Sequence, residues 1–169
     1  MAPVRSAFGF PDVVNEKAAR CVAAGVVALT ACTLASGWLW LSALLAVGFA
    51  LRVAAGPRWS PLGRLAAGVV APRLGPPRLV SGTPKRFAQA VGLTFTLAAT
   101  AALVLGAPTV TVVLLAVLLV FATLEAVLGF CAGCWVFARL IRLGVVRDDV
   151  CVECADLGAR RRPAQLEAH

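Results

Sequence analysis

The sequence is poor in the residues on which many soluble enzymes depend. It has no tyrosine, one histidine and only 14% charged residues among its 169. The single histidine is the last residue, His169, so no Ser–His–Asp set can be assembled around an internal histidine. A glycine-rich phosphate-binding loop is also missing from the sequence. Serine-hydrolase chemistry and histidine-based metal catalysis are therefore excluded.

Hydrophobic residues are what the chain has in excess. They make up 60% of it, and the mean hydropathy is +0.89. Soluble domains are typically close to half apolar, so a domain of this size would have to expose much of this surface to water. The net charge of +8 would suggest a nucleic-acid ligand in a soluble protein. Here it indicates basic loops against anionic lipid headgroups, so membrane lipid and not nucleic acid is the expected partner.

Four apolar stretches are candidates for membrane-spanning helices, each of which needs about 20 residues. The first three cover residues 18–36, 38–55 and 87–105. The fourth begins near Thr109 and stays apolar up to Arg139, roughly 30 residues, which is too long for one simple span. We expect it to cross the membrane by about residue 128 and to continue after Gly129 as a bent or separate segment.

These stretches predict an all-α integral membrane protein with four transmembrane helices arranged as two hairpins. A basic, proline-rich loop from 56 to 86 joins the hairpins, and residues 1–157 form one domain. The tail 158–169 is expected to be disordered. Within the loop, an apolar stripe at helical spacing predicts a short amphipathic helix in the cytoplasmic interface. The stripe consists of Leu62, Leu65, Ala66, Val69 and Val70.

The distribution of charge predicts the orientation in the membrane. All 16 lysines and arginines lie before or at the start of the first span, at the end of the second, between the second and third, or after the fourth. The connections around Gly37 and around residues 106–108 carry no charge. Because positive residues remain on the cytoplasmic side, both termini and the middle loop are expected there. The predicted location is the inner (plasma) membrane.

Four cysteines are the strongest candidates for chemistry: Cys131, Cys134, Cys151 and Cys154 in "CAGCWVFARLIRLGVVRDDVCVEC". Their spacing, C-x2-C-x16-C-x2-C, is typical of a four-thiolate zinc site. The same residues could instead form two redox pairs that exchange disulfides, because cations and helix N-termini lower thiol pKa values. A third interpretation treats Cys131 and Cys134 as small apolar residues at a helix end. Structural disulfides are the weakest interpretation for thiols on the cytoplasmic side.

Glu125 is the only acidic residue inside a predicted span. A carboxylate in a membrane is energetically costly and therefore suggests a function. The alternative is a structural carboxylate that either snorkels to the interface or forms an ion pair, for which Arg20 and Arg86 are the candidate partners. On a straight helix Glu125 does not share a face with the cysteines, so it would join them only if the chain bends at Gly129.

Three pieces of sequence carry a resemblance to a known family: "VNEKAAR" near the N-terminus, "RFAQAVG" at the third span and "GFCAGC" after the fourth. With them the chain resembles the bacterial membrane proteins grouped as domain of unknown function 4395. The resemblance implies a small multi-helix membrane protein with a Cys-x-Gly-Cys motif, here Cys131 and Cys134. It also implies an association with soluble thioredoxin-like or sulfurtransferase partners.

The leading functional hypothesis is membrane-associated thiol redox or sulfur handling through the four cysteines, for which no cofactor is certain and zinc is the candidate. A zinc-stabilised structural or scaffold protein is the first alternative. A small transporter is the second, and it would need a polar pathway of which only Glu125 and scattered threonines are visible in the sequence.

Overall fold

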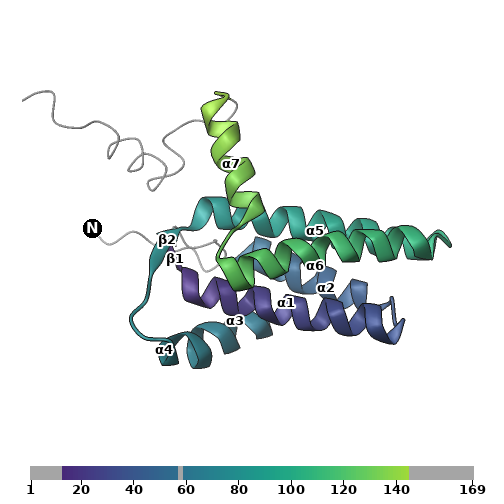
Figure 1. The fold of residues 1–169 in the computed structure, drawn as a ribbon, viewed down its shortest axis with the longest axis horizontal. Coiled ribbons are helices and arrows are strands. Elements are labelled where there is room, and N and C mark those ends of the chain that lie inside the picture. Colours follow the sequence, from purple (N-terminus) through teal and green to yellow (C-terminus); the bar gives the residue numbers. More distant parts are fainter. Residues whose placement is uncertain (1–12, 57–58, 145–169) are drawn as a thin grey trace, which may run out of the picture.

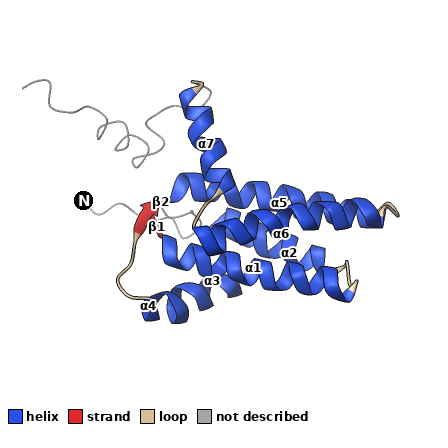
Figure 2. Ribbon diagram, in the orientation of Figure 1, coloured by secondary structure: helices blue, strands red, loops and turns tan. Residues whose placement is uncertain are grey.

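The computed structural model describes residues 13–56 and 59–144, and over these the chain is almost entirely helical (Figures 1 and 2). The elements in chain order are β1 (Val13–Asn15), α1 (Glu16–Ser36), α2 (Leu41–Ala55), α3 (Pro61–Leu65), the π-helix η1 (Ala66–Val70), α4 (Ala71–Arg73), β2 (Leu79–Ser81), α5 (Gly82–Val104), α6 (Pro108–Leu128) and α7 (Ala132–Arg142). The predicted helical class is confirmed, with two short strands in addition.

Among the residues that the structure describes, three helices, α1, α5 and α6, are by length and composition able to cross a membrane. The second predicted span, 38–55, corresponds to α2, which is apolar but has 15 residues. At 1.5 Å per residue it is about 22 Å long, less than the roughly 30 Å of a bilayer core. It starts only at Leu41 because the chain reverses at Gly37 (φ 71°) and passes through turns up to Trp40. The crossing of the membrane by α2 stays a prediction.

The helices α1, α2, α5 and α6 lie side by side as a bundle (Figure 1). The most extensive contacts join α1 to α6, α2 to α5, and α5 to α6, whereas α1 touches α2 much less. Each helix of the first hairpin therefore packs on a different helix of the second. The turns from α1 to α2 and from α5 to α6 lie at one end of the bundle, and β1, β2 and the start of α7 lie at the other (Figure 1).

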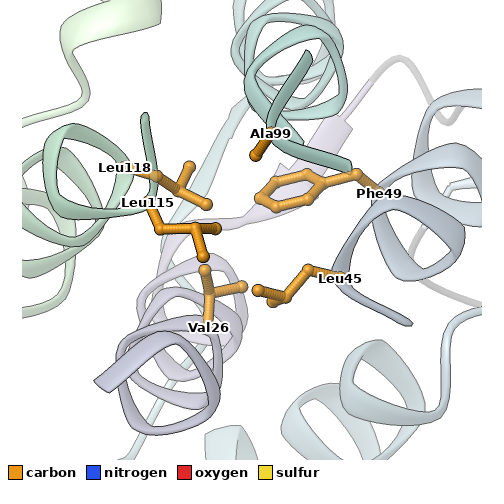
Figure 3. Packing of buried hydrophobic residues seen from close by; sticks show 6 residues of the cluster. All are labelled: Val26, Leu45, Phe49, Ala99, Leu115 and Leu118. Carbon is orange, nitrogen blue, oxygen red and sulfur yellow. The ribbon is translucent and has the colours of Figure 1, made fainter. Parts of the chain in front are cut away.

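The centre of the bundle is a small cluster of aliphatic and aromatic side chains (Figure 3). Its buried members are Val26, Leu45, Phe49, Ala99, Leu115 and Leu118. A Cβ atom at Gly92 would collide with the Phe49 ring, so glycine at this position lets α2 and α5 approach. Small residues at helix contacts are how apolar helices pack where lipid supplies no hydrophobic drive.

Buried hydroxyl groups add polar contacts between the same helices. The Thr111 hydroxyl donates to the Ala99 carbonyl over 2.9 Å and so joins α6 to α5. Ser42 and Thr100 join α2 to α5 through their hydroxyl oxygens, which are 3.0 Å apart. Because a bilayer core offers no water, such groups have to find partners within the protein.

The two strands form an antiparallel ladder that the sequence did not predict. Val13 lies opposite Ser81 and Asn15 opposite Leu79. The Asn15 side chain caps α1 by accepting from the Lys17 backbone N–H over 3.1 Å. Since β1 directly precedes α1 and β2 directly precedes α5, the ladder ties the starts of these two helices together. Strands of three residues are too short to show a period-2 pattern in the sequence.

The middle loop is helical from α3 to α4, and it packs on α1, where Leu62 lies over Gly25. The predicted stripe does not face the bundle as a unit. Ala66 is buried, but Leu65 and Val69 are exposed. The middle loop therefore contains helical turns, but an amphipathic helix in a membrane interface stays a prediction.

The predicted break after the last span is confirmed at Gly129. This residue adopts a left-handed conformation (φ 69°), which glycine tolerates best. The backbone N–H groups of Gly129 and Phe130 donate to the carbonyls of Glu125 and Leu124 and so close α6. The chain then leaves the bundle, and α7 extends sideways from its end (Figure 1).

Candidate thiol site

Cys131 is the N-cap residue of α7. It has an extended backbone (φ −93°, ψ 103°), and its Sγ accepts from the Cys134 backbone N–H over 3.3 Å. This is the geometry of a helix cap, with sulfur in the place usually taken by a serine or aspartate oxygen. The free N–H groups of a first turn favour a negative charge there, so the position suits a thiolate. Cys131 is buried, Cys134 is half-buried, and neither forms a disulfide.

Two contacts hold α7 against the start of α5. A Cβ atom at Gly133 would come within 2.6 Å of the Ala88 Cα, so glycine between the two cysteines permits the close approach. One turn further on, the rings of Phe137 and Phe87 pack with their centroids 5.5 Å apart. The glycine of the Cys-x-Gly-Cys motif therefore has a packing role that brings both thiols onto α5.

An ion pair lies next to the cysteines. The Lys85 Nζ is 2.8 Å from the Glu125 Oε1, and the two side chains are only 11% and 15% exposed. Both charges act electrostatically on Cys131 and Cys134. The bend at Gly129 thus brings Glu125 to the thiols. From the sequence, such a bend was the condition for Glu125 and the cysteines to share a site.

The expected partners of Glu125 were wrong. Arg20 instead donates to backbone carbonyls at the end of α6, with its Nη2 2.7 Å from the Val127 oxygen. Arg86 donates from Nε to the Val53 carbonyl over 3.2 Å. The helical position of Lys85, 40 residues before Glu125, turns it inward while its neighbour Arg86 points outward.

The two thiols differ in acidity. A hydrogen bond from the Cys134 thiol lowers the pKa of Cys131 below its ordinary value, and the Lys85 ammonium group lowers it further. Burial and the Glu125 carboxylate raise the pKa of Cys131 without reversing this result. The same hydrogen bond, followed by burial, raises the pKa of Cys134. Cys131 therefore ionises first, and Cys134 retains its proton.

A second polar contact lies deeper in the bundle and was missed in the sequence. Arg52 of α2 is 3% exposed, and its Nε donates to the Gln89 Oε1 over 2.8 Å. Its guanidinium also lies over the Phe49 ring, 4.4 Å from the centroid. Arg52 was counted only among the basic residues of the cytoplasmic side. In the sequence, Arg52 stands before the end of an otherwise apolar helix, and this position could have indicated that its side chain points inward.

A cavity of about 290 Å³ opens beside Cys131. It lies among α1, α2, α5, α6 and α7, and its walls are mostly apolar. Cys131, Glu125 and Gln89 are the polar residues that line it, whereas Cys134 does not. One thiol of the pair therefore faces an apolar chamber inside the bundle.

Comparison with known families bears on this arrangement. A family model described as a domain of unknown function (DUF4395) matches residues 14–142. The chain belongs to the DUF4395 family. This confirms the resemblance noted in the sequence, and the matched range contains Lys85, Glu125, Cys131 and Cys134. No curated protein and no solved structure matches the chain.

The second cysteine pair is not part of this DUF4395 match. Cys151 and Cys154 lie beyond residue 142 and also outside the residues that the structure describes, as does the tail 158–169. Within residues 13–56 and 59–144, no group of three or more His, Cys, Asp or Glu side chains could hold a metal ion. The zinc interpretation depends on Cys151 and Cys154, so the predicted four-thiol cluster stays a prediction.

Proposed function

We propose that this DUF4395 protein is a membrane-bound dithiol–disulfide exchange protein whose reactive pair is Cys131 and Cys134. The observation that carries the proposal is the position of Cys131 as the cap of α7 beside Lys85. A capped, partly cationic environment is what separates reactive cysteines from inert buried ones. A soluble thioredoxin-like or sulfurtransferase protein is the proposed partner.

The different environments of the two thiols assign them different roles. In the oxidised protein, a thiolate of the partner attacks the more exposed sulfur, Cys134, and the Cys131–Cys134 bond breaks. Cys131 leaves as a thiolate, which its surroundings stabilise, and a leaving thiol of lower pKa leaves faster. The partner's second thiol then attacks the mixed disulfide. The products are the Cys131–Cys134 dithiol and an oxidised partner.

The proposed setting is the inner membrane, with four spans, including α2, and with the thiol site at the cytoplasmic end of the bundle. The support is the charge distribution, since every lysine and arginine of the described helices and of the middle loop belongs to that end. The segment from α3 to α4 and the helix α7 would lie along the cytoplasmic interface. Exposed Leu65, Val69 and Trp135 are suited to contact lipid there.

We expect topology reporters to follow this arrangement. Reporters inserted at Gly37 and at Ala107 should show a periplasmic location, and a reporter fused after Gly158 a cytoplasmic one. At each site two reporters are compared, one that is active only in the periplasm and one that is active only in the cytoplasm. A periplasmic C-terminus would contradict the proposed contact with a cytoplasmic partner.

Trapping experiments test the exchange reaction itself. In Cys131→Ser, the remaining Cys134 should form a lasting mixed disulfide with a thioredoxin-like protein whose second cysteine is serine and whose first carries a thionitrobenzoate group. Thionitrobenzoate leaves, and neither protein then has a second thiol that could resolve the adduct. The adduct is measured by non-reducing electrophoresis and mass spectrometry. Cys32→Ser is the matched control, since Cys32 is exposed on α1 and lines no part of the thiol site. It should exchange as the unmodified protein does.

A second measurement distinguishes exchange from metal binding. The purified protein should contain no stoichiometric zinc, and its thiols should titrate without a chelator. One zinc per chain, together with the absence of any mixed disulfide in Cys131→Ser, would contradict the exchange proposal and favour the zinc-stabilised alternative.

A further inference from the structure

The cavity beside Cys131 has the character of a binding site for a small apolar molecule. Its volume of about 290 Å³ is close to the lower end of the range for ligand sites, which begins at about 300 Å³. Its wall includes three aromatic rings, those of Phe49, Phe95 and Phe121. Rings of this kind favour a flat, unsaturated ligand that can pack against their faces or edges.

The cavity opens towards the side of the bundle that would face lipid. Val91 of α5, Phe121 of α6 and Val136 of α7 line it and are each more than a third exposed. In a membrane these side chains would contact acyl chains. A ligand dissolved in the bilayer can therefore enter, whereas a charged soluble cofactor would have to cross apolar surface.

The polar groups of the cavity are few and suited to a carbonyl group. The Gln89 Oε1 accepts from Arg52, so its Nε2 is the group that can donate to a ligand oxygen. Glu125, held by Lys85, and Cys131 also line the wall. A thiol, an amide donor and an ion pair capable of proton transfer thus meet in one apolar chamber.

We propose that this cavity binds the ring of a lipid-soluble quinone, which accepts the two electrons of the Cys131–Cys134 dithiol. The inference rests on the proposed function, because it supplies the oxidant that regenerates the disulfide. In the net step two S–H bonds break and one S–S bond forms. The two electrons and two protons pass to the quinone, whose two carbonyl oxygens become the hydroxyl groups of a quinol.

The two cysteines would react with different molecules. Cys131 lines the cavity and reacts with the quinone, while Cys134, outside the cavity and more exposed, reacts with the soluble partner. The ring occupies the chamber, and its tail leaves between the exposed side chains of α5, α6 and α7. Electrons therefore pass from a soluble dithiol to the bilayer through one Cys-x-x-Cys pair.

The test uses the purified full chain, reduced and freed of excess reductant, with decylubiquinone as the probe. Every ring position of this quinone carries a substituent, which suppresses simple addition of thiols. We expect one quinol to form for each pair of thiols lost, measured by ultraviolet absorbance and thiol titration. Cys131→Ser should form none.

A cavity-filling variant and a matched control locate the reaction. Ala122 of α6 lines the cavity, so Ala122→Phe should slow quinol formation by at least about tenfold. Ala116 lies on the same helix, is exposed and does not line the cavity, so Ala116→Phe should react like the unmodified chain. Should Ala122→Phe not fold, Gln89→Met removes the proposed donor and should weaken decylubiquinone binding.

The outcomes separate the two proposals. If the dithiol exchanges with a thioredoxin-like protein but leaves decylubiquinone oxidised, the quinone inference is overturned and the exchange function stands. If neither reaction occurs, both proposals fail. Dodecylbenzene has a ring and a tail but no carbonyls. If it competes as well as the quinone, the cavity is a lipid site only, and the quinone inference is again overturned.

Discussion

Replacing Lys85 with methionine should destabilise the protein by about 3–5 kcal/mol, the usual cost of removing one partner of a buried ion pair. The Lys85 Nζ lies 2.8 Å from the Glu125 Oε1, and both side chains are largely shielded. Without the lysine, Glu125 would remain as a charge with little access to water. Electrostatic interaction with Arg52 offsets part of the loss and favours the lower end of this range. Chemical or thermal unfolding in detergent micelles measures the effect.

A double-mutant cycle identifies the pair as the cause. Lys85→Met combined with Glu125→Leu removes both charges and should recover most of the lost stability. Lys17→Met is the matched control, because Lys17 is less buried and its Nζ donates to the Leu74 carbonyl over 2.7 Å at an exposed position. It should cost less than about 1 kcal/mol. Equal losses in Lys85→Met and Lys17→Met would show that the Lys85–Glu125 pair does not contribute as described.

Replacing Cys134 with alanine should shift the reactivity of Cys131 to higher pH. The hydrogen bond from the Cys134 thiol is the largest cause that lowers the pKa of Cys131. When it is removed, burial and Glu125 continue to raise that pKa, and Lys85 and the Cys134 backbone N–H alone oppose them. Alkylation requires the thiolate, whose fraction at neutral pH falls about tenfold for each unit by which the pKa rises above the working pH. The more basic thiolate is about threefold more nucleophilic per unit, so the rate should fall about threefold.

The measurement is the pH profile of iodoacetamide alkylation at Cys131, in a chain that keeps Cys131 and Cys134 and has serine at its other cysteine positions. Cys134→Ser keeps a hydroxyl that can donate to Cys131 and should shift the profile less than Cys134→Ala. Glu125→Gln removes a charge that raises the pKa of Cys131, so it should shift the profile to lower pH. If Cys134→Ala and Glu125→Gln shift the profile in the same direction, the described electrostatics of the site are wrong.

The local structure could be predicted wherever the residues of one short segment determine it. The apolar stretches located the helices, although α1 and α5 begin before the predicted residues 18 and 87, because their first turns contain charged residues outside the apolar stretches. Gly129 marked the end of α6, and the basic residues after it did not prevent a further helix up to Arg142. The match of residues 14–142 to the family likewise follows from sequence pieces that were visible at once.

The partners of charged residues could not be predicted in the same way. Glu125 was recognised as unusual, but its assignment to Arg20 or Arg86 was wrong because adjacent residues on a helix point in different directions. Lys85 and Arg86 differ by one position, yet one is buried and the other exposed. The rotation of α5 about its axis decides which of them meets α6.

The sequence by itself determined that the chain is apolar, helical and interrupted at Gly129, because hydrophobic period and glycine conformation act over a few residues. Only the tertiary structure decided that α1 packs on α6, that Arg52 bonds Gln89, and that Lys85 and Glu125 flank the thiols of α7. These contacts join residues tens of positions apart, such as the 40 between Lys85 and Glu125. These contacts form only where the side chains fit together, as where the missing Cβ of Gly133 leaves room for Ala88. Such a fit produces no periodic pattern in the sequence.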